Sequence, residues 1–176
     1  VLKCANEHEV DIVALQETKH RDDCGWARSE CRSKGWYSEV SDPPPDESHR
    51  QGVARAGGTI LAWRTTLGKS GSLNVRGHRA CGRLFTSFTI LNVYVPAAGA
   101  DADWFREQLR VLEDANQQSL LMVGDLNWKG VYADLVPEGW SIADTPPTII
   151  AGSAAPTRMI SFGCGGFTLR TEAVQG

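Results

Sequence analysis

A short apolar run that ends in a glycine and an acid constrains this chain most. Leu120–Val123 lies between Ser119 and Gly124, and Asp125 and Asn127 follow. A run this short, bounded by a glycine, is typical of a buried strand that ends in a tight turn. Open α/β sheets place their chemistry at the carboxyl ends of such strands. The segment predicts either a reactive acid and amide or an ordinary Asx-rich turn.

Two other expected strands end in side chains that can do chemistry. Asp11–Gln16 is a short, β-branched apolar run, and Glu17 follows it directly. A carboxylate there can bind a hard cation such as Mg²⁺, or it can be a solvated turn residue. Tyr94 lies near the end of a strand that Pro96 stops. Its phenol can donate to a phosphate oxygen, or its ring can pack as a cross-strand aromatic.

The remaining segments predict alternating helices and strands. Helices are expected up to Glu9, within His20–Gly35 and over Asp101–Gln117, where apolar residues recur at helical spacing. Further strands are expected from Trp36, over Gly57–Arg64, twice within Leu84–Val95, and as a pair over Met159–Leu169. Ser41–Gly57 is expected to be a loop. Strands that alternate with helices and then cluster predict a layered α/β domain over residues 1–176.

Composition and cysteine spacing are those of an ordinary globular domain. The 176 residues are 41% hydrophobic and 22% charged, and no apolar run is long enough to span a membrane. The cysteines are scattered, without a C-x-x-C pair: Cys4, Cys24, Cys31, Cys81 and Cys164. This pattern argues against a zinc site and a disulfide framework. We therefore expect reduced thiols in an intracellular protein, nuclear or cytoplasmic.

Charge is unevenly distributed along the chain. Ser48–Ala100 contains no acid, whereas acids outnumber bases nine to three in Asp101–Ile150. The acid-free segment carries seven basic residues: Arg50, Arg55, Arg64, Lys69, Arg76, Arg79 and Arg83. Such a segment predicts either one face that meets phosphate or basic residues scattered over a solvated surface.

The order of these motifs resembles the endonuclease/exonuclease/phosphatase superfamily. The similarity is greatest to its AP-endonuclease-like branch and to the endonuclease domains of non-LTR retroelements. It extends from about Asp11 to Arg158 and rests on five segments: Asp11–Lys19, Gly57–Leu61, Asn92–Pro96, Val123–Asn127 and Pro156–Arg158.

The resemblance implies a fold, a cofactor and a partner. The fold would be a four-layer α/β sandwich with two facing mixed β-sheets. Glu17 would be the ligand of Mg²⁺, with Mn²⁺ as an alternative. Asp125 would orient or deprotonate the attacking water, Asn127 would hold the phosphate, and Tyr94 would contact the scissile phosphate. The partner would be nucleic acid, with DNA expected, facing the basic segment Arg50–Arg83. No obligate protein partner is expected.

The chain also departs from the family pattern, and three functions stay open. It begins after the family's first strand, which carries an Asn, and it lacks the closing Ser-Asp-His segment: no Asp-His pair occurs anywhere. The incomplete domain could be a Mg²⁺-dependent endonuclease fragment, with a retroelement as one source. It could be a phosphatase acting on a small phosphoester, or a decayed, non-catalytic relic that binds nucleic acid.

The missing first strand generates a stability prediction. A neighbouring strand would be left with unpaired N–H and C=O groups along one edge. We expect this chain to unfold at a lower guanidinium chloride concentration than a version extended at both ends. Unfolding curves of the two proteins check this, and equal midpoints would contradict it.

Overall fold

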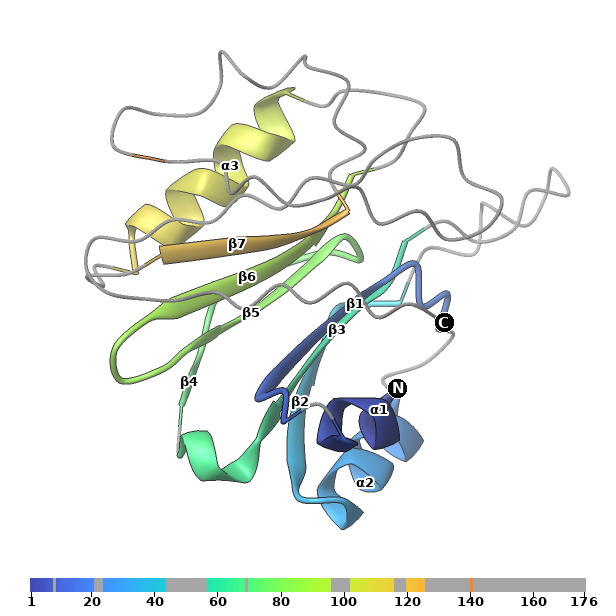
Figure 1. Cartoon of the computed structure of the whole chain (residues 1–176). Coiled ribbons are helices and arrows are strands. Elements are labelled where there is room, and N and C mark those ends of the chain that lie inside the picture. The colour runs from blue at the N-terminus through green and yellow to red at the C-terminus, as the bar shows by residue number, and fades with distance from the viewer. Residues whose placement is uncertain are drawn as a thin grey trace, which may run out of the picture.

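Two facing β-sheets form the centre of the computed structural model (Figure 1). The structure describes residues 1–7, 9–20, 24–43, 57–68, 70–95, 102–115, 120–125 and 140. In the first sheet the strands run in the order β1 (Ile12–Gln16), β3 (Thr59–Arg64), β2 (Trp36–Val40), all antiparallel. In the second the order is β4 (Gly71–Ser72), β5 (Ala80–Leu84), β6 (Thr89–Tyr94), β7 (Leu120–Asp125). Only β6 and β7 pair in parallel, so the second sheet is mixed.

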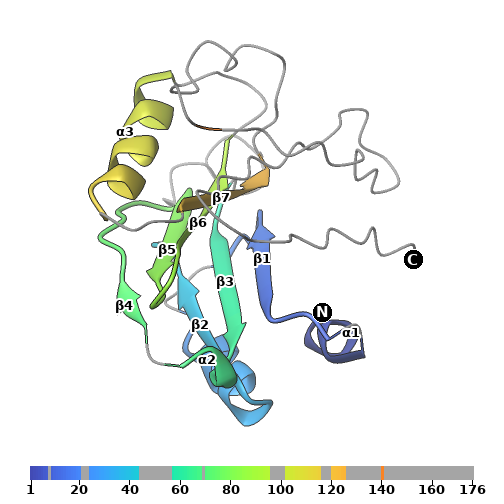
Figure 2. The ribbon, with the colours of Figure 1, turned by 60° about the vertical axis from the view of Figure 1, so that its left-hand side comes forward.

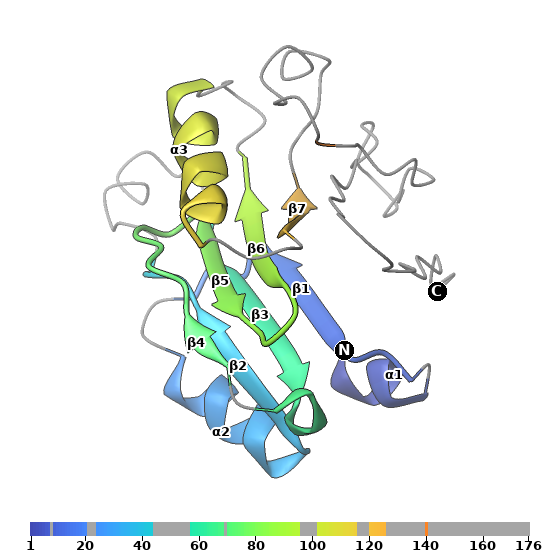
Figure 3. The ribbon, with the colours of Figure 1, turned by 90° about the vertical axis from the view of Figure 1, so that its left-hand side faces the viewer.

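Helices cover the outer faces of both sheets. Helices α1 (Leu2–Glu7) and α2 (Gly25–Ser33) pack on the first sheet, and α3 (Ala102–Glu113) packs on the second. Figures 2 and 3 show α3 on the far side of β5 and β6 from the first sheet. A short 3₁₀ turn, η2 (Thr65–Leu67), follows β3. The four-layer α/β arrangement implied by the family resemblance is confirmed, although the first sheet is antiparallel in its described strands rather than mixed.

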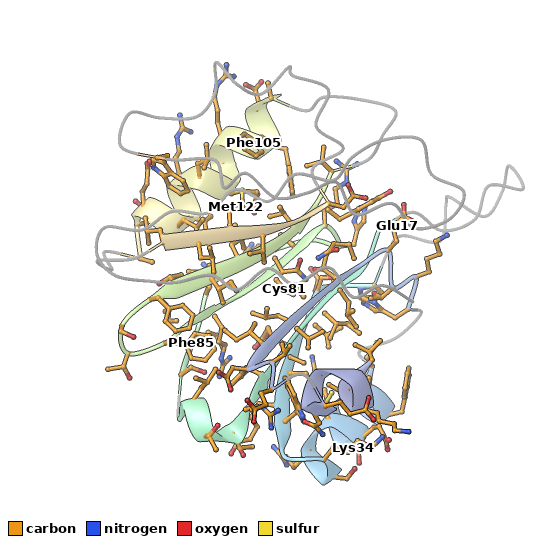
Figure 4. All side chains as sticks on the ribbon, in the orientation of Figure 1. Glu17, Lys34, Cys81, Phe85, Phe105 and Met122 are labelled. Carbon is orange, nitrogen blue, oxygen red and sulfur yellow. The ribbon has the colours of Figure 1, made fainter. Side chains whose placement is uncertain are left out.

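Side-chain alternation along β6 divides the core into two layers. Leu91 faces outward and packs with Phe105 of α3 and Met122 of β7. Ile90 faces inward and belongs to the cluster between the sheets, together with Leu61 of β3. Figure 4 shows Phe105 on α3 and Met122 below it, while Cys81 lies between the sheets. Because successive residues of a strand point to opposite faces, one apolar run supplies both layers.

Two expectations from composition can be compared with the described residues. Cys24, Cys31 and Cys81 carry free thiols, and all three are buried. Within the described segments, no helix has the length and apolarity needed to cross a membrane.

The strand expected to start at Leu84 was misplaced. The structure ends β5 at Leu84 and starts it at Ala80, and it adds the short β4, which was not expected. β5 was not recognised in the sequence because Gly82 and Arg83 interrupt its apolar run. A Cβ on Gly82 would lie 2.8 Å from the Ile90 carbonyl oxygen, so close strand packing excludes a side chain there. The expected pair over Met159–Leu169 and most of the Ser41–Gly57 loop lie outside the described residues.

Gly124 does not end its strand, as the sequence suggested, but lies inside β7. Its φ is +141°, and a Cβ there would lie 1.9 Å from the carbonyl oxygen of Val93 on β6. The glycine is therefore required for close approach of two parallel backbones, not for a turn. The strand then continues one residue further and ends with Asp125.

We expect Gly124→Ala to lower the free energy of unfolding by more than about 3 kcal/mol, because β7 must shift away from β6. Gly77→Ala is the matched control: φ is +93° there but the space is open. That change should lower the free energy of unfolding by only about 1 to 2 kcal/mol, which is usual when a residue with a side chain is placed in the left-handed region. Chemical denaturation measures both, and equal losses would contradict the close-approach explanation.

Candidate active site

The carboxyl ends of β1, β6 and β7 bring together three of the residues singled out in the sequence. The hydroxyl of Tyr94 donates a hydrogen bond to Oε1 of Glu17, across the gap between the sheets. Tyr94 and Asp125 are register partners on the parallel strands β6 and β7. The amide of Val95 donates to the Asp125 carbonyl oxygen at 2.8 Å, which extends this pairing by one step. Asn127 lies outside the described residues.

Tyr94 is held in its protonated form. Tyr94 is only 4% exposed. Burial is the largest cause that raises the pKa of its phenol, followed by the hydrogen bond to Glu17 and the negative charges of Glu17 and Asp125; Arg79 opposes the rise. At neutral pH Tyr94 is therefore a hydrogen-bond donor and not a base. The pKa also shows that both carboxylates lie within electrostatic reach of the phenol.

The carboxylate of Glu17 keeps an accessible side. Its Oε2 lies 3.8 Å from Nζ of Lys19, and about half of each side chain is exposed. Exposed ion pairs of this kind contribute little to stability, so this contact leaves the oxygen available to a ligand.

The donor set fits a hard divalent cation. Mg²⁺ usually takes one or two carboxylates and keeps several waters. Glu17 and Asp125 supply two carboxylates around one phenol. No group of three potential metal ligands occurs within the described parts of the chain. Glu17 and Asp125 are thus the residues that could hold Mg²⁺ or Mn²⁺ here.

A buried amide directly beneath these residues was missed as a site element. Asn92 is fully buried on β6, and its Oδ1 accepts a hydrogen bond from Nε2 of Gln16 at 2.6 Å. Its Nδ2 donates to the carbonyl oxygens of Leu15 and Ile60, at 3.0 and 3.1 Å. One side chain therefore connects β6 of the second sheet with β1 and β3 of the first. The signal in the sequence was a polar residue within an apolar strand, two positions before Tyr94.

Within the described part of the basic segment, Arg64 and Arg83 do not face the site. Arg83 is bonded to Glu39 at 2.7 Å and lies over the ring of Trp63. Arg64 lies over Trp36 and donates to the Val10 carbonyl oxygen. Both arginines lie at the end of the strands opposite Glu17. The prediction is wrong for these two residues, because neighbouring acids and aromatic rings engage them within the chain.

Arg79, another described residue of this segment, lies beside the site. Its carbonyl oxygen accepts the amide of Tyr94 at 2.7 Å, and its charge lowers the pKa of the phenol. The sequence offered no way to separate it from the other arginines of the segment.

A family model decides the classification. The model described as the Endonuclease/Exonuclease/phosphatase family matches residues 1–154. The chain belongs to this family. No curated protein sequence matches it.

Two solved structures share the fold. The human nocturnin catalytic domain with bound sulfate has a TM-score of 0.55 and 12% identity, over 91% of this chain and 72% of that one. Truncated TDP2 of Caenorhabditis elegans also has a TM-score of 0.55, with 15% identity, over 91% and 74%. The AP endonuclease of Archaeoglobus fulgidus has a TM-score of 0.48 and 18% identity, over 72% and 51%. The chain thus spans about half the length of that last protein.

We expect Asn92→Leu to lower the free energy of unfolding by about 3 kcal/mol or more. The change removes three hydrogen bonds between the sheets and leaves the Gln16 amide without its partner on β6. Gln16→Met is the milder comparison, because it removes only one of the three hydrogen bonds. Denaturation of both variants and of the double variant gives the coupling energy. Strictly additive losses would contradict a shared network.

Proposed function

We propose that this chain is a metal-dependent phosphodiester hydrolase that acts on nucleic acid. The observation that carries the proposal is the meeting of Glu17, Tyr94 and Asp125, from both sheets, at the carboxyl ends of three strands. Membership of the endonuclease/exonuclease/phosphatase family supports the same chemistry.

Each side chain has a role that suits hydrolysis of a phosphodiester. Asp125 orients the attacking water and accepts its proton. Tyr94, kept protonated, donates to a non-bridging phosphate oxygen once a substrate replaces Glu17 as its acceptor. Glu17 would hold the divalent cation. When bound, such an ion neutralises charge on the phosphoryl oxygens and stabilises the leaving oxygen.

A polymeric substrate is supported by the charge beside the site. Arg79 lies next to Tyr94 within the acid-free segment. Positive charge beside a reaction centre attracts a polyanion before the chemistry begins. A small phosphoester is the second candidate, because Arg64 and Arg83 are engaged within the chain and do not extend a basic surface toward the site.

Nicking of supercoiled plasmid in Mg²⁺ tests the function. We expect nicking that a chelator abolishes and that Asp125→Ala and Glu17→Ala each slow by at least about 100-fold. Asp103→Ala and Glu7→Ala are matched controls, since both remove exposed acids from helices away from the site.

The alternatives give different results. Turnover of p-nitrophenyl phosphate without nicking of plasmid would favour a small phosphoester. Absence of both activities, or nicking that survives Asp125→Ala and Glu17→Ala, would contradict the proposed function.

A further inference from the structure

Glu17 reaches the facing sheet from an unusual backbone conformation. Its φ is +52°, and Lys19 has a φ of +51°. Residues with a Cβ rarely adopt this left-handed region, and they stay there only where the surroundings hold them. Because the conformation follows directly after β1, it turns the Glu17 carboxylate toward Tyr94 rather than along the strand. The contacts of residues 17–20 therefore decide where this carboxylate lies.

Backbone hydrogen bonds hold only one side of this segment. The amides of Thr18 and Lys19 donate to the carbonyl oxygens of Gly58 and Gly57, both at 3.1 Å. Gly58 also permits close contact: a Cβ there would lie 2.6 Å from Oγ1 of Thr18 and 2.9 Å from Nδ1 of His20. The segment is thus packed tightly against the start of β3.

His20 holds the other side through its ring. Its Nε2 lies 3.1 Å from the carbonyl oxygen of Ser41, which can only accept, so Nε2 carries the proton. Nδ1 is then an acceptor, and the hydroxyl of Thr18 donates to it at 2.8 Å. Ser41 is itself fixed on Thr59 of β3 by hydrogen bonds of its own backbone and hydroxyl. His20 is buried, with 8% of the residue exposed.

We propose that His20 is a positioning residue, which fixes the left-handed segment through Thr18 and so holds the Glu17 carboxylate against Tyr94, ready to bind a divalent cation. The cation-binding part of this inference rests on the function proposed above. His20 does not contact the reacting groups. It acts as second-sphere hydrogen bonds do in metal sites, by orienting the ligand rather than by touching the metal.

The first readout is a signal that needs no metal and no turnover. The chain has three tyrosines, so ¹³C-labelled tyrosine gives few ring signals, and Tyr94→Phe assigns the one of interest. Glu17→Ala shows where this signal lies without its acceptor. We expect Thr18→Val and His20→Phe to move the Tyr94 signal toward that position, whereas Thr18→Ser, which keeps the hydroxyl, leaves it in place. Thr65→Val, at an exposed threonine of η2, is the matched control.

The second readout is the affinity for Mn²⁺ alone, measured from the free ion by electron paramagnetic resonance. We expect Thr18→Val to weaken binding roughly 10-fold or more, and Thr18→Ser to restore it. Unfolding midpoints identify any variant whose fold is lost, and Thr18→Val is the smaller change if His20→Phe fails to fold.

The outcomes separate this inference from the function itself. An unmoved Tyr94 signal in Thr18→Val, or wild-type Mn²⁺ affinity in that variant, would overturn the positioning role. Failure of the wild-type chain to bind Mn²⁺, or binding that is indifferent to Glu17→Ala, would instead overturn the proposed function. The Tyr94 signal would still decide whether His20 positions Glu17.

Discussion

The side-chain amide of Asn92 is the interaction on which the rest of the arrangement depends. It is the point where a strand of one sheet bonds to two strands of the other, through Gln16 and the carbonyl oxygens of Leu15 and Ile60. Sheets that meet only through apolar side chains can slide, because hydrophobic contact has no direction. A buried amide with directed partners removes that freedom. Glu17 and Tyr94 lie one and two residues beyond Gln16 and Asn92, so this bridge places both.

The space between the sheets changes character along the strands. At one end Trp63 and Phe85 pack edge to face in a cluster that is almost wholly apolar. The middle holds the amide bridge of Asn92, and the other end holds the carboxylate and phenol of Glu17 and Tyr94. Figure 4 shows Phe85 and Glu17 at opposite ends of this gap. The apolar end supplies most of the burial, and the opposite end carries the polar groups.

Much of the fold could be predicted because its signals are local. A few residues are enough to predict the strands at Ile12–Gln16 and Leu120–Asp125 from their apolar runs. The same holds for the helix Ala102–Glu113, which is predicted from its helical spacing. The bounds of β5 were predicted wrongly because Gly82 interrupts the alternation of its apolar residues. A glycine is needed at this position because the neighbouring strand lies close to it, and the sequence does not show that contact. At the site, Glu17 and Tyr94 were predicted, whereas Asn92 and the buried His20 were not singled out. Their roles exist only through partners distant in the sequence.

The amino-acid sequence by itself determined which segments become strands and helices, and which acids and phenol stand at strand ends, since both follow from short-range periodicity and turn residues. Only the tertiary structure decided that Tyr94 donates to Glu17, which lies 77 positions away. It also decided that Gly124 serves close approach rather than a turn, and that Arg83 pairs with Glu39 instead of facing outward. The physical reason is common to all three. Each depends on the register and facing of strands that are remote along the chain, and no local pattern encodes these.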